Sequence, residues 1–178
     1  MTDSGQKEPI HPAALPVDGL LAGCETQRTR RGGPGGQHRN KTETAIVITH
    51  RETGISGQAS ERRSQKDNRI EAIFRLRVNL AVAVRREKDA ADESVLPGDL
   101  WRGRVSGGKL VVSTSHEDFP ALVAEALDWV SSFEFELSAA AKKLGLSTSQ
   151  LVKFLKFCPE AWQWVQQQRH ERGLRRLK

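Results

Sequence analysis

The chain has 178 residues, which allows one domain with a small appendage, and its formal net charge is +6. Its two cysteines are too few for a disulfide framework, and no stretch approaches eighteen consecutive apolar residues, which argues against a membrane-spanning helix. Residues 1–16 are polar and hold no apolar signal core. We therefore expect a cytoplasmic monomer that uses neither a cofactor nor a metal ion.

The positive charge is concentrated in one segment. Residues 26–88 contain 15 Lys and Arg against 6 Asp and Glu, a net charge of +9, whereas the rest of the chain has 13 against 16, or −3. A cationic segment of this kind indicates a nucleic-acid partner. The alternative is a basic surface that only faces solvent.

The first half of the chain has the pattern of a small sheet with one covering helix. A mobile arm is expected over residues 1–19, with a helical turn at Leu20–Leu21. Strands are expected at residues 25–30, 44–50 and 55–59, the last two joined by a turn at 51–54. Ser60 would then cap a helix that ends near residue 86. The apolar positions expected to face the sheet are Ile70, Ile73, Phe74, Leu80, Ala81 and Val84.

Three basic residues follow the start of that expected helix at helical spacing. Arg62, Lys66 and Arg69 stand at i, i+4 and i+7, so they would form one stripe along its first turns. We expect this stripe to contact an RNA backbone. A solvated surface feature is the alternative.

The second half of the chain is expected to contain a hairpin followed by helices. Pro97-Gly98 closes a charged linker, and strands at residues 100–105 and 109–115 would be joined at 106–108. Helices are expected to begin at Pro120, Ser138, Ser147 and Pro159. The stretch 140–155 looks like a helix-turn-helix but has few base-reading side chains, which favours a small bundle. A basic tail follows: Arg169, Arg172, Arg175, Arg176 and Lys178, of which the first, second and fourth would share a helix face.

A run of glycine and proline lies between the first two expected strands. Gly32-Gly33-Pro34-Gly35-Gly36 permits backbone angles closed to other residues, and Gln37 follows it. The flanking residues are basic: Arg28, Arg30 and Arg31 before the run, and Arg39 and Lys41 after it. A narrow backbone segment that presents one polar side chain between basic residues suits insertion into a cavity lined with phosphate groups. A flexible linker is the alternative.

No set of residues in the sequence would hydrolyse an ester unaided. Neither a Ser-His-Asp order nor a glycine-flanked serine is found. Lys41-Thr42 lacks the glycine that a phosphate loop requires, because Asn40 occupies that place. His38 and His50 make a weak metal pair, and we favour structural or RNA-contacting roles for both.

The residues that follow the glycine run carry a family resemblance. Asn40, Thr53-Gly54-Ile55, Gln58, Arg63-Ser64-Gln65 and Asn68 occur in this order. Residues 26–83, about a third of the chain, thereby resemble the GGQ domain of class I peptide-chain release factors. They are closer still to the small codon-independent peptidyl-tRNA hydrolases that rescue stalled ribosomes.

The resemblance over residues 26–83, together with the sequence pattern of the remainder, implies a fold and a role for each matching residue. The fold would be α+β: a small GGQ domain, with a short sheet covered by a long helix, then a β-hairpin and a C-terminal helical bundle. The expected divisions are residues 1–19, 20–88, 89–118 and 119–178. The catalytic residues would be Gly35, Gly36 and Gln37, supported by Gly33, Pro34, Asn40, Arg63, Ser64, Gln65 and Asn68. The RNA-binding residues would be Arg28, Arg30, Arg31, Arg39, Lys41, Arg62, Lys66 and Arg69.

The resemblance also implies partners. These are the ribosome, with its large-subunit rRNA at the peptidyl-transferase centre and peptidyl-tRNA in the P site. A glutamine methyltransferase acting on Gln37 is a further partner, because family members are commonly methylated there. The reaction would be ribosome-dependent hydrolysis of the peptidyl-tRNA ester. The backbone N–H of Gln37 would stabilise the developing negative charge, and its side chain would admit water.

The chain departs from both groups that it resembles. No segment resembles the domain with which release factors read stop codons, and the last third is apolar where rescue hydrolases have a long basic tail. We expect a rescue function, with stalling sensed by residues 119–178. One alternative is a non-catalytic protein that occupies the peptidyl-transferase centre. Another is an RNA- or DNA-binding regulator that acts through the C-terminal helices.

Overall fold

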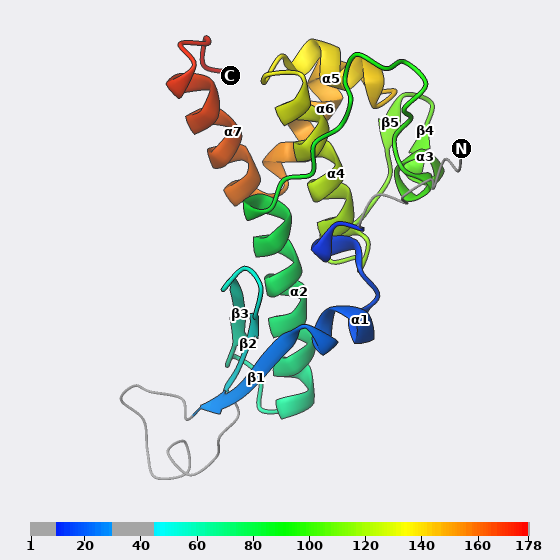
Figure 1. The fold of residues 1–178 in the computed structure, drawn as a ribbon. Coiled ribbons are helices and arrows are strands. Elements are labelled where there is room, and N and C mark those ends of the chain that lie inside the picture. The colour runs from blue at the N-terminus through cyan, green and yellow to red at the C-terminus, as the bar shows by residue number, and fades with distance from the viewer. Residues whose placement is uncertain (1–9, 30–44, 178) are drawn as a thin grey trace, which may run out of the picture.

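The computed structural model describes residues 10–29 and 45–177, and every element below belongs to these ranges. The fold is α+β, as expected: a small antiparallel sheet, a long helix beside it, a short hairpin and a group of C-terminal helices. The long helix is α2, Gln65–Ala83, which joins the two ends of the molecule (Figure 1). The sheet lies along its first half and the C-terminal helices lie around its last turns.

The sheet has three antiparallel strands in the order β1-β2-β3. They are β1, Cys24–Thr29, β2, Ala45–His50, and β3, Ser56–Ala59, so all three expected strands are confirmed to within a residue or two. The side chains of Ile46 and Ile48 in β2 are buried against α2, as the β-branched pattern predicts.

Gly57 allows β3 to lie against α2. A Cβ atom at this position would stand 2.3 Å from the Ala72 carbonyl oxygen and 2.3 Å from the Leu76 nitrogen. Both are backbone atoms of α2, which cannot move aside as a flexible side chain can. The helix and the strand therefore pack at a separation that only glycine permits.

Helix α2 begins later than the sequence predicts. Its N-cap is Ser64 and not Ser60, and the Ser64 hydroxyl accepts a hydrogen bond from the Asp67 N–H at 3.3 Å. Arg62 therefore precedes the helix, and the expected three-residue stripe is wrong because only Lys66 and Arg69 are helical. Ile70 is also wrong as a core position, since it is 58% exposed.

The first described residues pack against the remainder of the fold. A short 3-10 helix, η1, Pro12–Ala14, is capped by His11, and α1, Val17–Ala22, follows it. Ala13 is fully buried, and its carbonyl oxygen accepts a 2.9 Å hydrogen bond from Nε of Arg77 in α2. Within residues 10–19, which were expected in a mobile arm, His11, Pro12 and Ala13 are thus buried, whereas residues 16–19 are exposed.

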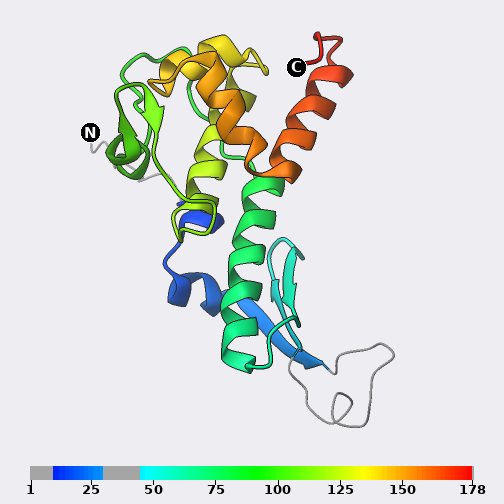
Figure 2. The ribbon, with the colours of Figure 1, turned by 180° about the vertical axis from the view of Figure 1, so that it is seen from behind.

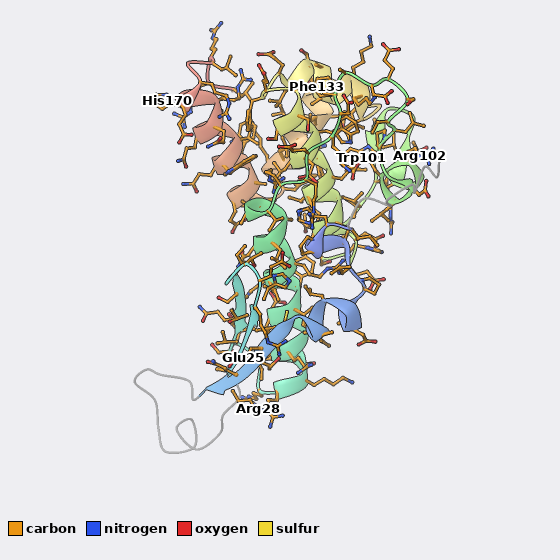
Figure 3. The ribbon with its side chains drawn as sticks, viewed as in Figure 1. Glu25, Arg28, Trp101, Arg102, Phe133 and His170 are labelled. Atoms are coloured by element: carbon orange, nitrogen blue, oxygen red, sulfur yellow. The ribbon has the colours of Figure 1, made fainter. Side chains whose placement is uncertain are left out.

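The expected hairpin is much shorter than predicted. Residues that were expected to form its first strand are helical in α3, Asp99–Arg104, and the strands are reduced to β4, Val105–Ser106, and β5, Lys109–Leu110. The helix buries Trp101, whose indole N–H donates to the Leu144 carbonyl at 2.9 Å. Figure 3 shows Trp101 and its neighbour Arg102 on this helix.

Four helices end the chain: α4, Phe119–Ser132, α5, Leu137–Lys143, α6, Thr148–Lys156, and α7, Pro159–Glu171. The cap Ser147 and the helix start at Pro159 are confirmed, whereas Ser138 lies inside α5, whose N-cap is Glu136. Gly145 ends the α5 turn with a φ of +69°, as its position suggests.

The basic side chains of the C-terminal tail are less free to bind RNA than the sequence suggests. Arg169 is buried at 7% exposure, and its guanidinium donates to the carbonyl oxygens of Phe135 and Arg175. Arg172 lies over the Phe135 ring at 4.4 Å and follows the end of α7. The expected shared basic face of Arg169, Arg172 and Arg176 is therefore wrong. Among the described helices, none is long and apolar enough to cross a membrane.

Candidate functional site

The glycine run lies between strands β1 and β2. The end of β1 pairs with the start of β2, so both ends of the intervening segment are held together. Thr29, the last residue of β1, is opposite Ala45, the first residue of β2. Ten of the expected site residues lie between them and outside the described residues: Arg30, Arg31, Gly33, Pro34, Gly35, Gly36, Gln37, Arg39, Asn40 and Lys41. What the structure describes is the base from which this segment extends.

The chain returns to the same end of the sheet through β3. Ala59 pairs with Ile46 of β2, next to the start of that strand, and α2 begins at Gln65 after a short connection. The first turn of α2 and the ends of β1 and β2 therefore lie together at one end of the molecule (Figure 1). We call this end the loop base, consisting of residues 28–29, 45–46 and 59–69.

Asn68 holds the connection between β3 and α2. Its side chain is fully buried, its Oδ1 accepts from the Arg62 N–H at 2.9 Å, and its Nδ2 donates to the Arg62 carbonyl at 3.0 Å. Both backbone groups of one residue are thus paired with a single amide side chain. Since buried polar groups are costly when unpaired, this pair fixes the path of residues 60–64.

Arg75 provides a second anchor, which the sequence analysis did not assign. Its NH1 donates to the Gln58 carbonyl at 2.8 Å and to Glu61 at 2.8 Å, and its Nε donates to Glu71 at 3.1 Å. The hydrogen bond from Arg75 lowers the pKa of Glu61 to about 2. Because both partners are about half exposed, the ion pair orients the connection more than it stabilises the fold. The spacing of Glu71 and Arg75 at i, i+4 is the signal that the sequence offered.

Exposed cations gather at the loop base from separate elements. The five are Arg28 on β1, Arg62 and Arg63 in the connection, and Lys66 and Arg69 on α2, and all are exposed. Arg28 lies at this end of the sheet in Figure 3. Of the residues expected to flank the glycine run, only Arg28 belongs to this cluster, and Arg30, Arg31, Arg39 and Lys41 lie outside the described residues. Such a cluster raises the local concentration of phosphate groups.

The triplet Thr53-Gly54-Ile55 lies at the opposite end of the sheet. The Thr53 hydroxyl contacts Nδ1 of His50 at 3.0 Å and accepts from the Ile55 N–H at 3.3 Å, and Gly54 has a φ of +71°. The triplet therefore shapes the β2–β3 turn and takes no part in the loop base. His50 is the last residue of β2 and contacts this turn, and within the described residues no cluster of His, Cys, Asp and Glu suits a metal ion.

Comparison with known proteins agrees with this architecture. Residues 22–99 match the model of the RF-1 domain. A segment of 71 residues is 44% identical to the chloroplastic peptide chain release factor PrfB1 of Arabidopsis thaliana, covering 40% of this chain and 15% of that protein. A segment of 83 residues is 40% identical to peptide chain release factor 1 of Xylella fastidiosa, covering 47% of this chain and 20% of that protein. No solved structure matches the chain.

The matched range contains the whole sheet and α2, together with the glycine run that joins β1 to β2. Through residues 22–99 the chain is similar to the GGQ-containing RF-1 domain of class I peptide-chain release factors. The matches span a fifth or less of the two relatives, and the C-terminal helices α4 to α7 lie outside the matched range.

Proposed function

We propose that this protein is a release factor-like peptidyl-tRNA hydrolase that acts on the ribosome. The observation that carries the proposal is the sequence Gly35-Gly36-Gln37 between β1 and β2 of an RF-1 domain. Two relatives are named as peptide chain release factors, and each shares the domain with this chain. The substrate would be the ester between the nascent peptide and the terminal ribose of P-site tRNA.

The chain's contribution to the reaction would be one inserted group. Water attacks the ester carbonyl, the bond to the ribose oxygen breaks, and that oxygen leaves as a hydroxyl after taking up a proton. The backbone N–H of Gln37 would donate to the oxygen on which negative charge develops, and one such donor typically contributes about 2.7–4 kcal/mol to lowering the barrier. The Gln37 side chain would select water, and the ribosome would supply the remainder of the site.

The loop base supports this role in two ways. Asn68, Ser64 and Arg75 fix the connection beside the strand ends from which the motif extends. The exposed cations of the loop base would bind rRNA phosphates, so that binding energy from the rRNA offsets the cost of inserting the loop. Gln65 and Arg63 would support the loop from the same connection.

We propose ribosome rescue, without stop-codon reading, as the setting of this activity. Residues 26–83 also resemble the codon-independent hydrolases, and helices α4 to α7, which lie outside the matched range, would dock the protein on the ribosome. The functional divisions would be a catalytic domain at residues 20–88, a linker and hairpin at 89–118 and a docking region at 119–178. The protein would act as a cytoplasmic monomer, and a glutamine methyltransferase would modify Gln37.

A release assay on ribosomes that carry labelled peptidyl-tRNA tests the proposal. The wild type should release peptide, and Gln37→Ala and Gly36→Ala should each lower the rate at least about a hundredfold while ribosome binding is kept. Gln27→Ala removes the same side-chain amide from β1, and Gly19→Ala adds a methyl group where no atom lies within 4 Å. Both controls should release peptide at the wild-type rate.

The choice of ribosome in this assay separates rescue from termination. Ribosomes on truncated mRNA should be better substrates than ribosomes halted at a stop codon. Equal release by the wild type and Gly36→Ala would contradict the catalytic role and favour a protein that only binds. Release restricted to stop codons would contradict the rescue role.

A further inference from the structure

The outer face of α6 carries a surface to which no role has been assigned. Leu151, Phe154 and Leu155 of this helix point into the bundle core and are buried. Lys153, Lys156 and the following residue Phe157 are on the opposite side and exposed. In Figure 2 this helix, coloured orange, lies at the front between the β4–β5 hairpin and α7.

Two grooves border α6 and share Lys153 and Phe157. The first, of about 320 Å³, runs between α6 and the segment Lys109–Val112. The second, of about 550 Å³, runs along Thr148, Val152 and Lys156 to Leu177. A continuous surface therefore extends across the helix from β5 to the end of the described chain.

The charge of this surface is of one sign. Lys109, Lys153 and Lys156 line the two grooves, and no Asp or Glu lines either of them. Within the described residues, Lys109 and Lys153 have no ion-pair partner. Lys156 is held with its Nζ 5.1 Å from the centroid of the Trp162 ring. The remaining polar lining consists of hydroxyl and amide groups, on Thr148, Ser149 and Gln150. Such a lining is complementary to a polyanion.

An exposed aromatic ring lies among these lysines. Phe157 is 49% exposed although its neighbour Phe154 is 4% exposed and packs on Trp101 with ring centroids 5.8 Å apart. About half of Phe157 is therefore accessible from solution. Lysines that follow a phosphate backbone and an aromatic ring on which a base stacks are the combination that binds single-stranded nucleic acid.

We propose that Lys109, Lys153, Lys156 and Phe157 form a binding surface for single-stranded RNA. The phosphates would lie along the three lysines and one base would stack on the Phe157 ring. A duplex is a poorer fit, since its bases are already stacked, and an acidic protein would match the lysines but not require stacking. The inference rests on the proposed function, because the ribosome is the source of the RNA. It adds a second rRNA-binding surface at the end of the molecule remote from the loop base.

Binding of a fluorescein-labelled, 12-nucleotide single-stranded RNA of mixed sequence to the full chain tests this surface. Lys109→Gln/Lys153→Gln should lower the slope of log affinity against log salt by about 1.4, or about 0.7 for each phosphate that is no longer neutralised. Lys142→Gln, on the exposed side of α5, is the control for loss of charge within the bundle. It should leave the slope unchanged.

Substitutions of Phe157 separate stacking from general apolar contact. Phe157→Leu should weaken RNA binding by about 5- to 140-fold, which corresponds to the 1–3 kcal/mol of one stacked base, whereas Phe157→Trp should retain it. If Phe157→Leu binds as tightly as the wild type, no base stacks there. A preference for poly-glutamate over the RNA would also overturn the proposal, in favour of an acidic protein partner.

Crosslinking locates the RNA independently of the cationic loop base. The same RNA with 4-thiouridine should crosslink within residues 109–112 or 148–157, and the double lysine variant should lose these crosslinks. Crosslinks confined to residues 26–88 would overturn the proposal. None of these measurements depends on peptide release. A protein without hydrolase activity could therefore still bind RNA at this surface, and an active hydrolase could fail to bind it.

Discussion

The side-chain amide of Asn68 pairs with both the N–H and the carbonyl of Arg62, at 2.9 and 3.0 Å. One buried side chain thus holds the segment that joins β3 to α2, beside the ends of the strands that carry the GGQ motif. The sequence placed Asn68 among the residues that support the loop. In the structure its hydrogen bonds act on the backbone of Arg62 at the loop base.

Asn68→Ala should lower the free energy of unfolding by about 1–3 kcal/mol, because the buried Asn68 amide makes two part-buried hydrogen bonds to the backbone of Arg62 and both are lost. Urea denaturation measures this change. Asn79→Ala is the control: its amide makes an exposed hydrogen bond to the Ser56 carbonyl at 2.8 Å, so its loss should cost less than about 1 kcal/mol. Equal effects of the two substitutions would show that burial of the Asn68 pair adds nothing.

Gly57→Ala should destabilise the protein by roughly 2 kcal/mol or more, because the new methyl group overlaps the backbone of α2. Thermal unfolding measures the effect. Gly103→Ala, in α3, adds a methyl group with no atom within 4 Å and should be neutral or stabilising. An unchanged melting temperature for Gly57→Ala would mean that β3 can move away from α2 freely.

Charge at the loop base should govern affinity for the ribosome. Arg62→Gln/Lys66→Gln/Arg69→Gln should weaken ribosome binding and lower its salt slope by about 0.7–0.9 for each phosphate that the variant no longer neutralises, with little change in release at saturating protein. Sedimentation of ribosome complexes at several salt concentrations measures the slope. Arg102→Gln/Lys142→Gln/Arg176→Gln removes the same charge from the remote end. If the loop-base variant has the same salt slope as this control variant, Arg62, Lys66 and Arg69 do not contact RNA.

The sequence predicts the sheet and most helices well because their signals are local. The β-branched run of β2, the cap Ser147 and the proline at the start of α7 each act within a few residues. The GGQ motif and the residues around it likewise depend on a short pattern, so the family could be predicted without the structure.

The misses have local and long-range causes. The helix cap was predicted at Ser60, but the hydrogen bonds between Asn68 and Arg62 hold the connection outside the helix as far as Ser64. Leu100–Arg104 has the pattern of a strand, yet burial of Trp101 beneath the Leu144 carbonyl favours a helix. Arg169 looks like part of a basic tail until its buried contact with Phe135 is known. Such long-range effects override local propensity.

The buried position of Arg169 gives the first residue of the basic tail a structural role. Arg169 donates to the carbonyl of Phe135, a residue with a φ of +66° in the turn between α4 and α5. Arg169→Met should therefore cost about 1.5–3 kcal/mol, the range for hydrogen bonds made by a charged group. Arg176→Met, at an exposed position, should leave stability unchanged in the same urea titration. Matching midpoints for the two variants would contradict a structural role for Arg169.

His11 should make the fold sensitive to acid. It is buried, its Nδ1 accepts from the Ala13 N–H at 3.0 Å, and its Nε2 lies 3.1 Å from the Val84 carbonyl, to which it can donate only as Nε2–H. This arrangement requires the neutral ring, since protonation of Nδ1 would remove the acceptor of the Ala13 hydrogen bond. Burial lowers the pKa of His11 to about 4, and the nearby charges of Arg85, Arg86 and Lys88 act in the same direction.

The unfolded chain therefore binds a proton at His11 near pH 6.5, whereas the folded chain binds it only near pH 4. Stability from this residue is full above pH 6.5 and declines by about 3 kcal/mol as the pH falls to 4. Asp128 opposes the trend, because burial raises its pKa to about 6 and the folded state then takes up a proton there. Comparison of urea unfolding for the wild type and His11→Asn between pH 4 and 7 isolates the histidine. Asn keeps an acceptor for Ala13 but cannot titrate, so its variant should lose less stability toward pH 4. Parallel pH profiles for the two proteins would contradict the prediction.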